Sequence, residues 1–445
     1  MTEKEILSKI KGQYENLPYP NIPIEKTADD DYNALFVHDL RTSYYLAFQE
    51  IIDLKNTIIL DAGCGSGWKS LVLAYANPNA KIIGVDLSPK SVEIAQARFE
   101  YHGLTNGEFY ALNLEDLPSL NYQFDYINCD EVIYLLPEPE KGLKILQSVL
   151  KERGILRTNF HNYYQRFSIF TIQKLFRTLG LMEESPDDLE VEIVKDTFTK
   201  LKNNIGIKAQ WNNIFTQFSP EKQKSSILMN YLLESDKGFT IPDVFAMLNN
   251  ANLKFLSMTD WRSWNIQDLF EELPEYWEMG LENISQEEEL NLYDLLNPIH
   301  RLIDFWCVNN QTSLPSLTPV SAWNDNDWDN AIIYVHPQLK TDKIKQDLLR
   351  SIEQQQSFII SKYITLTARG NIELESNMTA CLLCLWEKET NLQELVNRWL
   401  KIQPLNLLTF EEMTYEEAKK QVINTLIKLE NFLYILIEQG KKSIV

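Results

Sequence analysis

The stretch Ile58–Gly67, IILDAGCGSG, decides the fold class of this chain, because it leads from an apolar segment through a glycine turn into a helical pattern. The apolar, β-branched residues Thr57–Leu60 predict a strand, and the spacing of Trp68–Ala76 predicts a helix. A second apolar segment, Lys81–Val85, predicts the next strand. Because a strand, a helix and a strand follow one another, we expect a parallel sheet with a right-handed crossover.

The alternation of strands and helices continues along the chain. A helix is expected to begin after Ser88, a residue type that caps helices, with Pro89 at its first position and its end near Gly103. Further elements are expected as strands at 107–111, 124–129 and 154–159 and as a helix at 139–150. Five strands that alternate with helices predict an open α/β sheet.

The regular alternation is interrupted after the fifth strand. Residues 161–239 have mainly helical patterns, and the alternation resumes with a helix that Thr240 caps and that has Pro242 in its first turn. Later elements are expected as strands at 253–258 and 300–309, with a second, acidic helical insertion at 265–298 between them. We therefore expect one sheet whose last strands arrive after a helical insertion.

The end of the chain differs from the rest in pattern. Residues 310–330 are rich in Ser, Thr, Pro, Asn and Asp without a period, and they predict a linker to residues 331–445. In that C-terminal region we expect a strand at 358–367, two helices within 378–402 with Thr390 as the second N-cap, and a long helix at 415–439. This order favours a winged-helix-like α+β accessory domain, and a plain helical domain is the alternative.

The composition limits the classes of function. The 445 residues carry a formal net charge of −21, which disfavours a surface that neutralises the phosphates of nucleic acids. No apolar run has the length of a signal peptide or of a membrane span, so we expect a cytoplasmic protein without a membrane partner. The cysteines are scattered and odd in number, which is typical of reduced thiols, and Cys381 and Cys384 are read as small apolar residues on a buried helix.

The glycine turn itself predicts a ligand site. Glycines at positions 63, 65 and 67 let the backbone approach a bound molecule where a Cβ atom would collide, and the following helix presents unpaired N–H groups. The spacing is GxGxG rather than the GxGxxG of dinucleotide sites, and Asp61 precedes the first glycine by two residues. Because this carboxylate would repel a pyrophosphate, a ligand with a positive charge is favoured.

Three further polar segments end predicted strands. Asp86 ends the second strand, where its carboxylate can accept two hydrogen bonds from a ribose diol. After the third strand, the side chain of Asn113 and the backbone of Leu114 are placed to meet an adenine edge, and Asp130 follows the fourth strand. Because the carboxyl ends of parallel strands lie at one edge of a sheet, we expect these residues at one ligand site.

These segments resemble successive motifs of the class I S-adenosylmethionine-dependent methyltransferases. The similar stretches are LDAGCGSG, GVDLSPKSVEIAQAR, the region of Asn113 and FDYINCDEVIYLLPEPEKGL. The resemblance covers residues 46–160 and extends to 240–309 as the methyltransferase core. It implies a Rossmann-like, doubly wound, mostly parallel sheet of seven strands with an antiparallel last strand. It also implies S-adenosylmethionine as the cofactor and S-adenosylhomocysteine as the product.

The resemblance further implies which residues contact the cofactor: Asp61, Ala62, Gly63, Cys64, Gly65, Gly67, Asp86, Leu87, Asn113, Leu114, Asp130 and Tyr19. Asp61 is expected near the amino-acid part, Asp86 at the ribose hydroxyls and Leu87 against the adenine. The sequence departs from the family at Asn113, which is often acidic, at Glu131, which is often small, and at Tyr134–Leu135, which is often a histidine pair. These departures leave the acceptor side open.

The N-terminal arm, residues 1–45, contains YENLPYP at Tyr14–Pro20, which is similar to segments that fold over the cofactor in some methyltransferases. Tyr14 or Tyr19 is therefore a candidate lid, and a proline-rich surface arm is the alternative. Methyl transfer needs no side-chain nucleophile or metal, so the catalytic residues stay unknown and no metal is expected. Weak candidates for a general base are His161, after the fifth strand, and Tyr14; a structural histidine is the alternative.

The residues and the resemblance together predict methyl transfer to an oxygen or nitrogen nucleophile of a small molecule, peptide or protein by in-line displacement. The alternatives are a cofactor-binding scaffold without activity and, disfavoured by the charge, a nucleic-acid methyltransferase. The helical and C-terminal regions are candidate surfaces for a homodimer. Two expectations follow: Asp86→Ala weakens cofactor binding, and removal of residues 331–445 leaves it intact.

Overall fold

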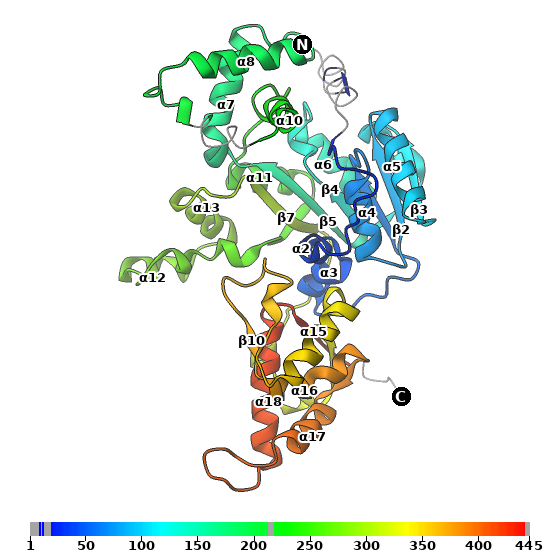
Figure 1. The fold of residues 1–445 in the computed structure, drawn as a ribbon, viewed down its shortest axis with the longest axis vertical. Helices are drawn as coiled ribbons and strands as arrows, with labels where there is room; N and C mark the ends of the chain where they lie inside the picture. Colours follow the sequence, from blue (N-terminus) through cyan, green and yellow to red (C-terminus); the bar gives the residue numbers. More distant parts are fainter. Residues whose placement is uncertain (1–8, 10, 13–18, 210, 212–217, 441–445) are drawn as a thin grey trace.

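A computed structural model of the chain describes residues 9, 11–12, 19–209, 211 and 218–440. Its centre is a seven-stranded sheet with the strand order β3-β2-β1-β4-β5-β7-β6 (Figure 1). The strands are β1 Ile58–Ala62, β2 Lys81–Asp86, β3 Gly107–Ala111, β4 Phe124–Cys129, β5 Leu150–His161, β6 Leu253–Met258 and β7 Leu302–Asn309. Strands β1 to β5 pair in parallel, and β7 runs antiparallel to both β5 and β6. The predicted Rossmann-like sheet with its antiparallel last strand is therefore confirmed.

Helices cover both faces of this sheet. They are α2 Tyr32–His38, α3 Leu40–Phe48, α4 Trp68–Ala76, α5 Pro89–Tyr101, α6 Pro139–Ser148 and α11 Ile241–Asn250. Alternate strand residues face opposite sides, so Ile59 packs with α2 to α5, whereas Leu60 packs with α6 and α11. Ser88 before α5 and Thr240 before α11 both accept hydrogen bonds from helix backbone N–H groups, which confirms the two predicted N-caps.

The first helical insertion follows β5 and lies at one end of the sheet (Figure 1). Its helices are α7 Tyr163–Thr178, α8 Asp188–Lys200 and α10 Pro220–Asn230. They share a core of their own that includes Phe176, Phe198 and Tyr231. The second insertion contains α12 Glu275–Leu281 and α13 Gln286–Leu296, and α13 packs against the main core through Leu290 and Tyr293. Both segments are helical, as their patterns predict.

The C-terminal region forms a second lobe at the opposite end of the sheet (Figure 1). Its three-stranded sheet has the order β11-β8-β12. Its strands are β8 Ala331–Val335, β11 Thr390–Asn391 and β12 Ile435–Gln439, and β9 Phe358–Ile359 pairs with β10 Glu373–Leu374 in a separate two-stranded sheet. The helices are α15 Asp342–Glu353, α16 Ser376–Leu382, α17 Leu392–Ile402 and α18 Tyr415–Glu430. The lobe combines strands with helices, and its winged-helix-like character stays a prediction.

The long helix expected at 415–439 is the main local error of the sequence analysis. Helix α18 ends at Glu430, and Leu433 has a left-handed φ of +54°, which a continuing helix cannot contain. The apolar residues Ile435–Ile437 then pair with β8 in an antiparallel register. An apolar run of this length fits a buried strand as well as a helix, and the partner strand decides between them.

Two smaller predictions for this lobe are also wrong. The strand expected at 358–367 is limited to the two residues of β9, because a 3-10 turn begins at Ile360. The second N-cap is Asn391 rather than Thr390, because the side-chain oxygen of Asn391 accepts a hydrogen bond from Glu394 N at 2.9 Å. Both errors shift the boundaries of elements and leave the order of the helices unchanged.

The segment 310–330 is only partly the linker that its composition predicts. Its second half contains the 3-10 helix η5 Val320–Ala322 and the helix α14 Asp325–Asp329. The side chains of Val320, Trp323 and Trp328 are buried in the apolar core of the C-terminal lobe. This half of the segment therefore belongs to the lobe rather than connecting to it.

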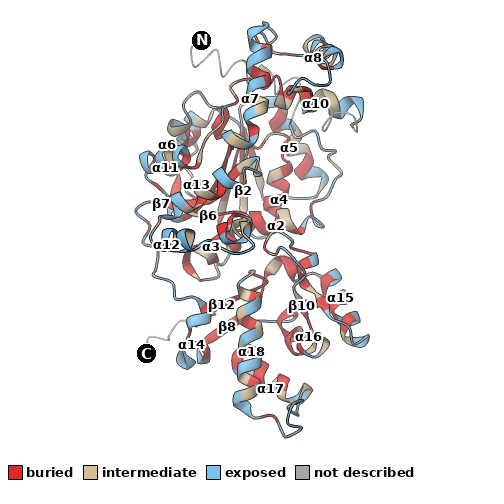
Figure 2. Cartoon of the chain, turned by 90° about the vertical axis from the view of Figure 1, so that its left-hand side faces the viewer, coloured by how far each residue is buried: buried red, intermediate tan, exposed pale blue. Residues whose placement is uncertain are grey.

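Helices α2 and α3 join the C-terminal lobe to the sheet. Tyr45 Oη donates to Glu430 Oε1 at 2.9 Å and to Ile437 O at 3.0 Å. Gln338 Nε2 donates to the buried Asp39 Oδ2 at 2.7 Å. One apolar core runs from the α4 side of the sheet into the lobe, and Figure 2 shows buried residues in both parts. Residues 32–45 of the predicted N-terminal arm are therefore core helices rather than a lid.

The described chain contains no helix that combines the length and the hydropathy needed to cross a membrane. All five cysteines are buried and unpaired. Cys381 Sγ donates to Leu395 O at 3.3 Å inside the C-terminal lobe, which agrees with the interpretation of this cysteine as a small core residue.

Candidate functional site

The glycine turn between β1 and α4 is fixed by backbone hydrogen bonds. The N–H groups of Gly63 and Cys64 donate to Val85 O at 2.8 and 2.9 Å. All three glycines have left-handed φ values, +81° at Gly63, +50° at Gly65 and +77° at Gly67. Such values are unfavourable for residues with a Cβ atom, so the local backbone requires glycine at each position.

Other parts of the chain fill the space beside each glycine. A Cβ atom at Gly63 would collide with the side chain of Val132, and one at Gly65 would collide with the carbonyl oxygen of Tyr19. A Cβ atom at Gly67 would collide with α5. The glycines therefore let neighbouring segments close around the turn, and Gly63 and Gly65 also line the cavity beside it.

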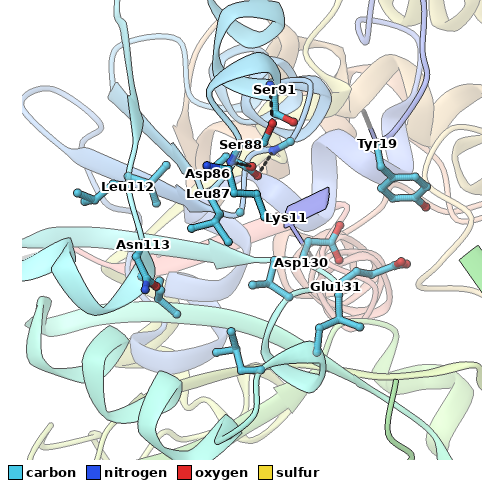
Figure 3. A pocket seen from close by; sticks show the side chains of 17 residues that line it. Lys11, Tyr19, Asp86, Leu87, Ser88, Ser91, Leu112, Asn113, Asp130 and Glu131 are labelled. Atoms are coloured by element: carbon cyan, nitrogen blue, oxygen red, sulfur yellow. Dashed lines mark hydrogen bonds between the residues drawn. The ribbon is translucent and has the colours of Figure 1, made fainter. Parts of the chain in front are cut away.

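A cavity of about 140 Å³ lies at the carboxyl ends of β1 to β4 (Figure 3). It is lined by Lys11, Tyr19, Gly63, Gly65, Val85, Asp86, Leu87, Ser88, Ser91, Leu112, Asn113, Leu114, Asp130, Glu131, Val132, Leu135 and Leu136. In Figure 3, Asn113 and Tyr19 lie on opposite sides of the view, with Asp86 and Asp130 between them. We call this space the donor cavity. It brings together most of the residues that the sequence analysis assigns to a ligand.

Four of the assigned residues do not line the donor cavity: Asp61, Ala62, Cys64 and Gly67. Asp61 is buried behind it, where Ser70 Oγ donates to one carboxylate oxygen at 2.5 Å and Asn128 Nδ2 donates to the other at 2.8 Å. Burial raises the pKa of Asp61 to about 6. Its carboxylate therefore links α4 to β4, and its contact with the amino-acid part of the cofactor stays a prediction.

Asp86 is held in place by the glycine turn and by the start of α5. Gly65 N donates to Asp86 Oδ2 at 2.9 Å, and Ser88 N donates to Asp86 Oδ1 at 2.9 Å. Burial raises the pKa of this carboxyl above its usual value, against the effect of the two backbone donors. Asn113 Oδ1 caps the 3-10 helix η1 Leu114–Leu120, which fixes the orientation of its amide.

Asp130 lines the donor cavity and also takes part in a buried polar network. Its carboxylate lies 3.3 Å from Arg157 Nη2 and 3.1 Å from Lys69 Nζ, and it accepts from Asn159 Nδ2 at 2.5 Å. Burial alone would raise the pKa of Asp130, but the two cations hold it below its usual range. Arg157 also donates to Asp304 Oδ2 at 2.6 Å. Asp130 is therefore a carboxylate whose position is fixed from several sides.

A second cavity of about 240 Å³ adjoins the first one. It is lined by Tyr19, Glu131, Tyr134, His161, Met229, Asn230, Leu233 and Arg301. Tyr19 and Glu131 line both cavities. Met229 and Asn230 come from α10, so the first helical insertion forms part of the wall. We call this space the acceptor cavity.

His161, a candidate base, has both ring nitrogens engaged. Its Nδ1 lies 2.6 Å from Asp236 Oδ1, and Arg301 Nη1 donates to its Nε2 at 3.0 Å. Burial lowers the pKa of His161 below its usual value. A neutral ring that donates through Nδ1 and accepts through Nε2 is a structural link, so neither nitrogen is open to a substrate. Tyr14, the other candidate, lies outside the described residues.

Glu131 and Arg301 are not among the site residues predicted from the sequence. Arg301 Nη2 donates to Glu131 Oε1, and this ion pair lies at the wall of the acceptor cavity. Glu131 stands directly after Asp130 in the fourth-strand motif, which is a weak signal. Arg301 precedes β7, and no local pattern shows that β7 places it beside the end of β4.

Comparisons with known proteins agree with this architecture. Residues 53–232 match the family model described as a methyltransferase domain. An uncharacterized protein of Synechococcus sp. is 25% identical over 324 residues, which are 72% of this chain and 75% of that protein. A ubiquinone biosynthesis O-methyltransferase of Coxiella burnetii is 26% identical over 172 residues, which are 39% of this chain and 71% of that relative.

A solved structure shares the fold over most of the chain. The structure of PKMT2 from Rickettsia typhi in complex with AdoHcy matches with a TM-score of 0.58 at 19% identity, covering 96% of this chain and 78% of the other. The family model begins before β1 and extends through β5, so it includes the strand ends that form the donor cavity. Residues 53–232 are therefore a methyltransferase domain of the class I, S-adenosylmethionine-dependent kind.

Proposed function

We propose that this chain moves the methyl group of S-adenosylmethionine to a nitrogen or oxygen nucleophile held in the acceptor cavity. The observation that carries the proposal is that the two cavities meet, because Tyr19 and Glu131 line both of them. A donor in the first cavity and an acceptor in the second would face each other across these two side chains. The acceptor would be a small molecule or a side chain of a peptide or protein.

The residues of the donor cavity suit the cofactor. Asp86 presents a carboxylate, the group that accepts hydrogen bonds from a ribose diol. Leu87 and Leu114 offer apolar surface to an adenine ring, and Asn113 offers an amide beside them. Asp130 would hold the ammonium of the amino-acid part. When bound there, S-adenosylmethionine supplies an electrophilic methyl group, so the chain needs to bring a nucleophile to it.

The chain's own residues then orient the acceptor and exclude water. A nucleophile must lie about 3 Å from the methyl carbon and in line with the leaving group. Backbone and side-chain bonds hold the segment at Tyr19 against the glycine turn, because Ser66 N donates to Tyr19 O at 3.1 Å and Ser66 Oγ donates to Pro20 O at 2.7 Å. We propose that Tyr19 serves as the lid on this side, and that α10 closes the other.

Transfer of tritiated methyl groups from labelled cofactor into a cell extract tests the proposal. The extract is divided afterwards into protein, nucleic-acid and small-molecule fractions. Label is expected in the protein or the small-molecule fraction. Label confined to nucleic acid would contradict the proposed acceptor class, and cofactor binding without any transfer would indicate a binding protein without activity.

A further inference from the structure

We propose that Glu131 receives the methyl acceptor and that the acceptor enters as a protonated amine. This inference rests on the proposed function, since it names the nucleophile that the acceptor cavity takes. Glu131 lines both cavities, so its side chain lies where donor and acceptor would meet. Within the described parts of the chain, Tyr19 is the only other residue in that position.

Glu131 occupies this place in a backbone conformation that side chains rarely adopt. Its φ is +57°, in the left-handed region. The neighbouring strand holds the turn, because Asn159 Oδ1 accepts from Glu131 N at 2.8 Å while Asn159 Nδ2 donates to Asp130. A glycine would satisfy this backbone without strain, and strained residues that their surroundings hold in place cluster at functional sites. We therefore attribute the presence of a glutamate at this strained position to its carboxylate side chain.

A chain of hydrogen bonds fixes that carboxylate from the helical insertion. Arg301 Nη2 donates to Glu131 Oε1, and Arg301 Nη1 donates to His161 Nε2 at 3.0 Å. His161 Nδ1 is 2.6 Å from Asp236 Oδ1, which places the proton of the neutral ring on Nδ1. Two side chains of α7 donate to the other oxygen of Asp236 at 3.1 and 2.8 Å. The relay Asp236–His161–Arg301 thus positions Glu131 and does not itself face the donor.

The wall around Glu131 suits an ammonium group better than an anion. Arg301 is the one cationic side chain among the described residues that line the acceptor cavity, and its charge is paired with Glu131 while its Nη1 donates to His161. Glu131 uses Oε1 for this pair, and no donor of the described residues meets its second oxygen. The rings of Tyr19 and Tyr134 line the same cavity. A carboxylate and aromatic rings that line one cavity are groups that attract ammonium ions.

Glu131 would also accept the proton that occupies the lone pair of the amine nitrogen. The ammonium gives one proton to the Glu131 carboxylate, which becomes a carboxylic acid, and the amine nitrogen regains its lone pair. That lone pair is the nucleophile of the transfer proposed above. The carboxylic acid afterwards returns its proton to water, so the side chain is regenerated. Glu131 raises the pKa of the Tyr19 hydroxyl to about 12, so this phenol stays protonated and neutral beside the amine.

Binding of n-butylammonium chloride to the full chain loaded with S-adenosylhomocysteine, followed by ligand-observed NMR, tests the inference. We expect n-butylammonium to bind and sodium butyrate not to bind. Glu131→Gln keeps the shape of the side chain and removes its charge, so it should weaken n-butylammonium binding about tenfold or more. The inference would be overturned in favour of an anionic acceptor if the wild type bound butyrate and Arg301→Met did not.

Two further variants separate the carboxylate from general damage to the fold. Glu138→Gln changes an exposed carboxylate that lines neither cavity. It should leave the affinities for n-butylammonium and for S-adenosylhomocysteine unchanged. Glu131→Asp keeps the charge and should retain part of the n-butylammonium binding. The inference is wrong if the wild type does not bind n-butylammonium or if Glu131→Gln binds it equally well. Loss of S-adenosylhomocysteine binding by the wild type would instead refute the proposed function.

Discussion

Asp86 is the residue on which the proposed cofactor contacts depend most. Its two carboxylate oxygens each accept one backbone hydrogen bond, and the side chain still lines the donor cavity. A carboxylate oxygen has more than one acceptor position, so the same group can receive a ribose diol in addition. The Asp86 carboxylate at the end of β2 is therefore held in one orientation and can still accept further hydrogen bonds.

Asp86→Ala is expected to weaken binding of S-adenosylmethionine about tenfold or more, because charge-assisted hydrogen bonds to the ribose are lost. Isothermal titration calorimetry measures the affinity. Asp116→Ala removes a nearby exposed carboxylate and should leave the affinity unchanged. Equal affinities of Asp86→Ala and the wild type would contradict the ribose assignment.

Asp61 gives a prediction about pH, because burial raises its pKa to about 6 from an ordinary value near 3.8. Between these two values the unfolded chain loses a proton that the folded chain keeps, so this group lowers stability as the pH rises through the interval. Asp61→Asn removes this titration. The free energy of unfolding of Asp61→Asn minus that of the wild type should therefore rise by about 2 to 3 kcal/mol between pH 4 and pH 7, because only the wild type loses this contribution. Urea unfolding at both pH values measures it, and a constant difference would contradict the raised pKa.

The residues of the donor cavity were largely predictable, and those of the acceptor cavity were not. Gly63, Asp86 and Asn113 each follow a recognisable strand, and parallel strands end at one edge of a sheet. The pair of Glu131 and Arg301 joins positions 170 residues apart. Their contact exists because β7 lies beside β5. This strand order is part of the tertiary structure, and no local sequence pattern predicts it.

At the scale of elements, boundaries were predictable where a cap or a turn residue marks them. Ser88 and Thr240 begin α5 and α11 as expected, since each has an oxygen that accepts from the first turn. The end of α18 has no such mark. The run Ile435–Ile437 forms a strand because it pairs with one edge of β8. The helical pattern that precedes the run continues into it, so the sequence alone predicts a longer helix.

Ile437→Ala tests the strand β12 at this scale. Ile437 is fully buried and pairs with Ile333 of β8, so removal of its side chain should lower the free energy of unfolding by about 2 to 4 kcal/mol. Gln439→Ala, at the exposed end of the same strand, should change it by less than about 0.5 kcal/mol. Denaturant unfolding measures both variants, and similar small losses in the two would contradict the buried strand.

At the scale of the whole molecule, the C-terminal lobe is an integral part of the fold. It shares an apolar core with α2 and α3, and Thr42 Oγ1 is 2.9 Å from His336 Nε2 of the lobe. On α2, His38 Nε2 lies 3.3 Å from Arg157 Nη1, and Arg157 Nη2 lies 3.3 Å from Asp130 Oδ1. Contacts thus run from the lobe to the floor of the donor cavity.

Removal of residues 331–445 should therefore destabilise the chain and impair cofactor binding, which reverses the expectation from composition alone. The physical reason is the exposure of Phe36, Tyr45 and the rest of the shared core to water. Thermal unfolding and calorimetry with S-adenosylhomocysteine compare the truncated chain with the full one. A truncated chain that folds and binds like the full chain would show that the lobe is an independent domain.

In the function proposed above, the cavity at the ends of β1 to β4 holds the methyl donor of an active enzyme. The most direct measurement is tritiated methyl transfer into extract by three proteins, the wild type, Asp86→Ala and Asp116→Ala. We expect transfer by the wild type and by Asp116→Ala, and a loss of about tenfold or more in Asp86→Ala at cofactor concentrations below saturation. Absence of transfer by a wild type that binds the cofactor, or equal transfer by all three proteins, would contradict it.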